Sequence, residues 1–128
     1  MEDNIRDKRH RALEFGAFAE EKAAEHYVSQ GYAILERNWI LGKIEIDVIA
    51  RKEDVIAFVE VKARSGRDQD AFETVTYDKM KRMARGAHAY LKKTDGNVEY
   101  RFDVFTVTGD TNDYVTEVFE DAFLSPLF

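Results

Sequence analysis

Polar and apolar residues alternate along two consecutive stretches of the chain, residues 44–50 and 55–64. Alternation with a period of two, rich in β-branched residues, predicts two strands, and the charged segment 51–54 between them predicts a tight turn. In that register Asp47 faces Phe58 and Glu45 faces Glu60. The backbones of Asp47 and Glu60 are then diagonal neighbours, roughly 7–8 Å apart. A slip of one residue would instead place the acids on opposite faces.

Apolar residues at helical spacing predict two helices, over residues 11–30 and 76–92. Three further stretches predict strands, at residues 32–38, 100–108 and 114–119. We expect residues 1–10 to be frayed. We also expect residues 120–128 to form an apolar C-terminal tail that packs on this chain or on a neighbouring copy.

The predicted order is one helix, three strands, a second helix and two strands. Three consecutive strands suit an antiparallel meander, and the strand–helix–strand step suits a right-handed parallel crossover. The sequence therefore predicts a single α/β domain over residues 1–128, with a mixed sheet of about five strands flanked by helices.

Composition excludes several classes of site. The 128 residues include no cysteine, so disulfides, thiol nucleophiles and cysteine-ligated zinc are excluded. No apolar run approaches the length of a membrane span, and the N-terminus lacks the apolar core of a signal peptide. We therefore expect a cytoplasmic protein with no membrane partner.

Charge is unevenly distributed along the chain. The net charge is −6, yet residues 77–93 hold six basic residues and one acid. This segregation permits a basic face for nucleic acid on the second helix, although such a face is usually only solvated.

The two central strands carry the candidate chemistry. Carboxylates that oppose each other destabilise a sheet unless something neutralises them. A divalent cation such as Mg²⁺ would neutralise Asp47 and Glu60, and Lys62 adds a positive charge beside them. Two acids, a lysine and a metal suit phosphodiester hydrolysis. The alternative interpretation is a solvated strand face with a weak ion pair. The apolar residues on the same faces favour the metal site, because charges in a covered sheet need a partner.

Glu20 borders the apolar stripe of the first helix. It lies either in solvent, which is the commoner case, or over the sheet as a third carboxylate directed at Asp47 and Glu60.

Several motifs in a fixed order resemble the YraN family of predicted bacterial endonucleases, over roughly residues 14–107. The motifs are Glu20, then Gly31-Tyr32-x-Ile34-Leu35-x-Arg37-Asn38-Trp39, Glu45-Ile46-Asp47-Val48-Ile49-Ala50, Phe58-Val59-Glu60-Val61-Lys62-Ala63-Arg64, Val75-Thr76-x-x-Lys79 and Arg101-Phe102-Asp103-Val104.

The resemblance implies a restriction-endonuclease-like fold with a PD-(D/E)xK site, similar to that of archaeal Holliday junction resolvases. Asp47 and Glu60 would then hold Mg²⁺ or Mn²⁺, together with the backbone carbonyl of Val61. Lys62 would be the lysine of the motif, and Glu20 the helix-borne acid that completes the catalytic set.

The resemblance also implies a substrate and an assembly. We expect DNA, branched or nicked, contacted by Lys79, Arg82, Arg85 and Arg64, and a homodimer that places two sites on one junction. The role of Glu45 stays open. Ala19, Ile40 and Ile44 depart from the family pattern at positions where it has glycine, arginine and glycine, which affects substrate affinity rather than the four catalytic side chains.

Three functions fit this sequence. The first is a metal-dependent endonuclease that hydrolyses DNA. The second is a non-catalytic nucleic-acid-binding or adaptor protein that retains the nuclease fold. The third is a protein-interaction module. Metal dependence separates the first from the second, and salt dependence of DNA binding separates both from the third.

Overall fold

The computed structural model describes residues 5–65, 76–94 and 96–122. Its elements are α1 (Ile5–Ser29), β1 (Ala33–Leu41), β2 (Ile44–Lys52), β3 (Val55–Arg64), α2 (Tyr77–Leu91), β4 (Glu99–Gly109) and β5 (Tyr114–Phe119). The strands form one sheet in the order β1-β2-β3-β4-β5, in which only the β3–β4 pair is parallel. The predicted α/β class, meander and parallel crossover are therefore confirmed.

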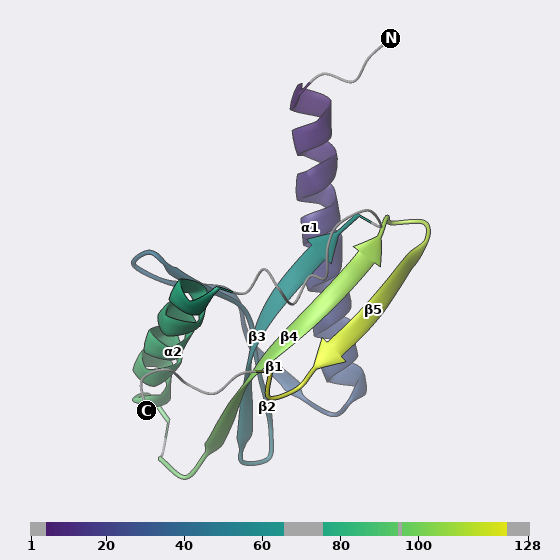
Figure 1. The fold of residues 1–128 in the computed structure, drawn as a ribbon. Coiled ribbons are helices and arrows are strands. Elements are labelled where there is room, and N and C mark those ends of the chain that lie inside the picture. Colours follow the sequence, from purple (N-terminus) through teal and green to yellow (C-terminus); the bar gives the residue numbers. More distant parts are fainter. Residues whose placement is uncertain (1–4, 66–75, 95, 123–128) are drawn as a thin grey trace.

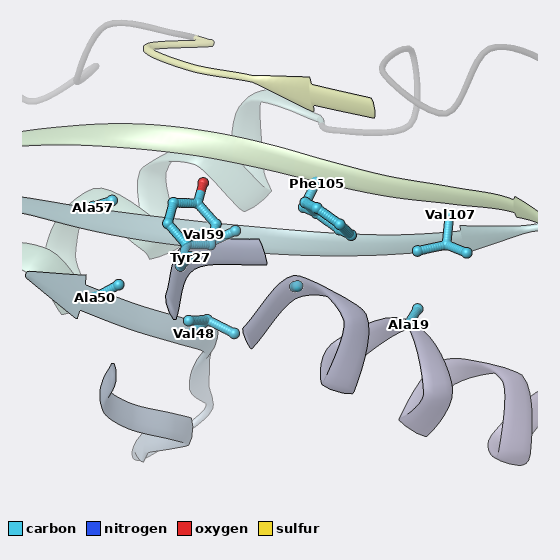
Figure 2. Packing of buried hydrophobic residues seen from close by; sticks show 9 residues of the cluster. Ala19, Tyr27, Val48, Ala50, Ala57, Val59, Phe105 and Val107 are labelled. Carbon is cyan, nitrogen blue, oxygen red and sulfur yellow. The ribbon is translucent and has the colours of Figure 1, made fainter. Parts of the chain in front are cut away.

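The two helices cover opposite faces of the sheet (Figure 1). Ala19, Ala23 and Tyr27 of α1 pack on one face, against small and β-branched residues of β2 and β3 and against β4 (Figure 2). On the other face, α2 packs against bulkier aliphatic and aromatic side chains, which include Phe58 and Phe102. Both faces of the central strands are thus covered, as the apolar residues beside the acids indicated.

α1 begins at Ile5, so the prediction that residues 1–10 are frayed was wrong for its second half. Half of the six extra residues, 5–10, are the good helix formers arginine and lysine, but every residue from 5 to 14 is exposed. No apolar stripe marks them, which is why periodicity did not detect this part of the helix. Residues 1–4 and most of the predicted apolar tail, residues 123–128, lie outside the described residues.

The predicted register of β2 and β3 was wrong by two residues. Lys52 pairs with Val55 and Val48 pairs with Val59, so the turn has two residues, with Glu53 at φ 54°. Two-residue hairpin turns need a positive φ, and the segment lacks the glycine that usually signals one. A shift of two residues keeps the side chains of the paired segment, residues 48–52, on their predicted faces.

The β1–β2 hairpin is also tighter than predicted. Residues 39–41, expected in a connection, extend β1 to Leu41, and a two-residue turn at Gly42 (φ 61°) follows. Trp39 consequently packs with the core beneath α2.

A buried polar network fastens α1 to the sheet. The hydroxyl of Tyr27 donates to Oδ2 of Asp103 at 2.6 Å, and Nε of Arg101 donates to Oδ1 of the same carboxylate at 2.9 Å. The backbone N–H of Asp121 donates to Oδ1 as well. Asp103 is fully buried, and these partners compensate its charge. Tyr27 follows Glu20 by two helical turns, so the network also fixes the face that Glu20 presents to the sheet.

Candidate active site

The candidate site lies where β2 separates from β3. The ladder between these strands ends at the pair Val48–Val59. Beyond this pair, the backbone N–H of Val61 donates to Oδ2 of the Asp47 side chain at 2.8 Å. In a regular antiparallel ladder, a backbone carbonyl of the neighbouring strand would be the acceptor. Ile46 packs beneath α2 and Val48 beneath α1, so β2 does not alternate regularly across Asp47. This irregularity directs the carboxylate of Asp47 toward the gap between β2 and β3.

Glu60 of β3 stands at the same gap and is only 3 % exposed. Nζ of Lys62 lies 3.0 Å from its Oε2, and Nζ of Lys79, on the first turn of α2, lies 3.5 Å from its Oε1. Oε1 is nevertheless buried without a hydrogen bond within the described part of the chain. Burying a carboxylate requires compensation, and two lysines supply the charge but leave one oxygen unsatisfied.

The protonation of Asp47 depends on the neighbouring Glu60. Burial, followed by the charge of Glu60, raises the pKa of Asp47 to about 7, although the hydrogen bond from the N–H of Val61 opposes the rise. A carboxyl group with a pKa near neutrality, next to a buried second carboxylate, marks a functional site more often than a structural one.

Glu20 approaches from the α1 side of the sheet. It is half-buried, and its charge is one of the causes that raise the pKa of Asp47. Across residues 5–65, 76–94 and 96–122, no three acidic or histidine side chains are grouped closely enough to hold a metal together. Glu20 therefore acts on Asp47 from a longer range than Glu60 does.

One expectation on β2 requires correction. Glu45 does not face Glu60; it is exposed and pairs with Ile40 of β1, because the β2–β3 ladder ends before this residue. The ammonium of Lys79 lies beside Glu60, and its contact with a phosphate stays a prediction. The metal-ligand role of the Val61 carbonyl stays a prediction, whereas its N–H has an observed role in orienting Asp47.

The proposed arginines divide into two groups. Arg64 is half-buried two residues beyond Lys62, and its Nε is buried with no hydrogen-bond partner among the described residues. Arg82 and Arg85 lie on the exposed side of α2. The first two turns of α2 thus bring Lys79 to the acids while they leave both arginines in solvent.

The donor set fits a hard divalent cation. Such ions take oxygen ligands, and Mg²⁺ is commonly held by one or two carboxylates. The unsatisfied Oε1 of Glu60 and the carboxylate of Asp47 are two acidic oxygen groups at one gap, and each is destabilised by the other's charge. A cation between them would relieve that repulsion, as the sequence pattern led us to expect.

Two contacts of the site had no signal in the sequence. The pairing of Lys79 with Glu60 depends on how α2 crosses the sheet, and neither helix–sheet distance nor angle can be derived from periodicity. The N–H of Val61 is a backbone group, so only the end of the β2–β3 ladder reveals its role.

Of the described helices, neither is long and apolar enough to cross a membrane.

The chain matches the model of a family described as "Uncharacterised protein family UPF0102" over residues 19–107. A UPF0102 protein of Phocaeicola vulgatus is 36 % identical over 119 residues, which cover 90 % of this chain and 96 % of the relative. Another from Bacteroides thetaiotaomicron is 38 % identical over 116 residues, covering 90 % and 96 %. A more distant source, Campylobacter fetus, has one that is 36 % identical over 104 residues, covering 81 % and 92 %. All the proposed site residues, from Glu20 to Arg85, fall inside the matched segment. The chain therefore belongs to the UPF0102 family.

Proposed function

We propose that this protein is a metal-dependent endonuclease that hydrolyses phosphodiester bonds of DNA. One observation carries the proposal: Asp47, Glu60 and Lys62 meet at the gap between β2 and β3, and one buried oxygen of Glu60 lacks a hydrogen bond there. A structural ion pair would be expected to satisfy its buried oxygens. An open acceptor beside a second carboxylate suits a site that binds a cation during its reaction.

Each side chain has a role in this proposal. Asp47 and Glu60, with the carbonyl of Val61, would hold Mg²⁺ or Mn²⁺. The bound ion supplies a Lewis acid that lowers the pKa of a water molecule and stabilises negative charge on the transferring phosphoryl group. Lys62, whose Nζ lies 3.0 Å from Oε2 of Glu60, would donate a hydrogen bond to the same phosphate. Glu20, whose charge also influences Asp47, would accept a proton from the attacking water.

Lys79 and Arg64 would bind the phosphates that flank the cleaved bond. Both lie next to the acids, and Arg64 has an unsatisfied buried donor. Arginine matches phosphate geometry well because its donors form a planar fork. Arg82 and Arg85, which are exposed on α2, would contact more distant phosphates.

The fold supports the same proposal by analogy. A central sheet with an antiparallel β1–β2–β3 meander, a parallel β3–β4 step and one helix on each face is consistent with the restriction-endonuclease-like arrangement. Such an analogy raises the expectation of nuclease chemistry without establishing it. Branched or nicked DNA as substrate, and a homodimer that acts on it, belong to the same proposal.

Cleavage assays test the activity. Labelled linear duplex, single-stranded, flap and four-way-junction DNA are incubated with Mn²⁺, Mg²⁺ or EDTA. We expect cutting that requires metal and that falls at least about 10²-fold in Asp47→Asn and Glu60→Gln, since both remove a negative charge from the metal site without changing side-chain size. Asp54→Asn is the matched control, because Asp54 is an exposed acid in the β2–β3 turn.

The outcomes separate the candidate functions. Equal cutting by wild type and Asp47→Asn would identify a contaminating nuclease and remove the role of Asp47. DNA binding that is insensitive to EDTA and to Asp47→Asn, without cutting, would favour the non-catalytic nucleic-acid-binding protein instead.

A further inference from the structure

The first part of α1 is an exposed helix that extends beyond the sheet. All residues from 5 to 14 are exposed, and Phe15 is the first side chain of α1 that packs against the core beneath it. Figure 1 shows this part of the helix continuing past the edge at which β3 and β4 end. We call residues 5–14 the basic arm.

The basic arm differs in charge from the rest of the protein. Its ten residues include four lysines or arginines and two acids, whereas the whole chain has a net charge of −6. Glu14 is engaged by His10, with 2.7 Å between Oε1 and Nε2. Arg6, Lys8 and Arg9 have no ion pair within the described part of the chain. Their charges are therefore available to a partner outside this molecule.

The apolar residues of the basic arm do not suit a protein or membrane partner. Ile5 and Leu13 are 68 % and 75 % exposed. They are eight residues apart, which is more than two helical turns, and basic or polar side chains separate them. A helix that pairs with another helix or lies in a bilayer interface needs a continuous apolar stripe. Positive charge without such a stripe complements a polyanion instead.

We propose that the basic arm binds the phosphate backbone of nucleic acid that extends from the candidate active site. Glu20 follows Glu14 by six residues, about 9 Å along the helix axis, so a strand bound at Asp47 can continue beside the arm. The arm is roughly 15 Å long, a length that corresponds to about four phosphates of one strand. The inference rests on the proposed function for the identity of the partner, and it assigns a substrate-holding role to residues that precede the family-matched segment.

Binding measurements in EDTA test the arm without any cleavage. The variant Arg6→Gln/Arg9→Gln removes two charges one turn apart, and glutamine maintains the helix because its propensity is close to that of arginine. The matched control is Lys92→Gln/Lys93→Gln, which makes the same change in charge at the C-terminal end of α2. Fluorescence anisotropy of a labelled duplex and of a labelled four-way junction is followed as salt is increased.

We expect the slope of log affinity against log salt to become less steep by nearly two units in the arm variant, because each phosphate contact contributes about 0.9. Its affinity at low salt should fall about tenfold. The control variant should retain the wild-type slope. Circular dichroism of both variants should match that of the wild type.

Two results would overturn the inference. One is an unchanged salt slope in the arm variant; the other is a loss of binding to phosphatidylserine vesicles while DNA binding stays intact, which would assign the arm to membranes. The separate cleavage assay distinguishes this inference from the proposed function. A changed salt slope without metal-dependent cutting would support nucleic-acid binding by the basic arm and reject the nuclease activity. Metal-dependent cutting with an unchanged salt slope would support the nuclease activity and reject binding by the basic arm.

Discussion

At the scale of single residues, Asp47 links the site to stability. Its folded-state pKa is raised to about 7 by burial and by Glu60, whereas the unfolded chain has a value near 3.8. Between about pH 4 and pH 7 the folded state holds a proton that the unfolded state has released. Stability therefore falls as pH rises through that range, and the loss is complete above pH 7.

Replacing Asp47 with asparagine should remove this loss. We expect Asp47→Asn to raise the free energy of unfolding of the metal-free protein at pH 8 by about 2 kcal/mol, and to have little effect at pH 4. Its amide oxygen can still accept the N–H of Val61. Urea unfolding at both pH values measures the difference. Asp54→Asn, at an exposed acid, should change neither value, and a destabilised Asp47→Asn protein at pH 8 would contradict the assigned pKa.

The sequence predicted that Asp47 and Glu60 lie close together, but not the geometry or the burial of their contact. Alternation led to that prediction, and the two acids do lie close together, but Asp47 reaches Glu60 through the irregularity of β2 beyond the end of the ladder. The pKa of Asp47 and the open oxygen of Glu60 depend on burial and on where the ladder ends. Both are tertiary properties, so no local pattern encodes them.

At the scale of elements, the fit of α2 against the sheet depends on Gly86. A Cβ atom at this position would lie 2.9 Å from Cγ2 of Ile44 and 3.1 Å from Cδ1 of Ile46. Close packing therefore explains a glycine in the middle of a helix.

Alanine at the two helical glycines should have opposite effects. Gly86→Ala gains about 1 kcal/mol in helix propensity but overpacks the interface by about 1–3 kcal/mol, so we expect net destabilisation of about 1 kcal/mol. Gly16→Ala meets no atom within 4 Å and should stabilise by about 0.5–1 kcal/mol. Thermal unfolding of both variants checks the signs. A Gly86→Ala protein as stable as Gly16→Ala would show that the α2 interface can relax.

Element order and strand identity followed from periodicity, whereas element ends did not. β5 was predicted with its observed bounds, because turn residues flank it closely. β1 and α1 were both longer than predicted. The sequence predicted Trp39 in a connection, because its burial beneath α2 is a tertiary contact that no local pattern shows. The basic arm has no apolar stripe that would predict a helix. Patterns of burial cannot detect segments whose structure is local and exposed.

At the scale of the whole molecule, the proposed metal site would couple metal, protons and folding. Without metal, the acids at the gap destabilise the folded state at high pH. A cation bound as proposed would reverse that effect, because it would bind the ionised carboxylates of the folded state and not the dispersed acids of the unfolded chain. The same two carboxylates should therefore lower stability in EDTA and raise it with Mn²⁺.

Thermal unfolding with Mn²⁺ tests this coupling without any substrate. We expect Mn²⁺ at 100 times its Kd to stabilise the wild type by about 2.7 kcal/mol at pH 8. At pH 6 the ion must displace the proton of Asp47, so the apparent affinity should be about tenfold lower and the stabilisation about 1.4 kcal/mol smaller at the same concentration. Asp47→Asn and Glu60→Gln should abolish the effect, and Asp54→Asn should retain it. Stabilisation that is equal at both pH values, or that persists in Asp47→Asn, would place the ion elsewhere and leave Lys62 and Lys79 as the sole partners of Glu60.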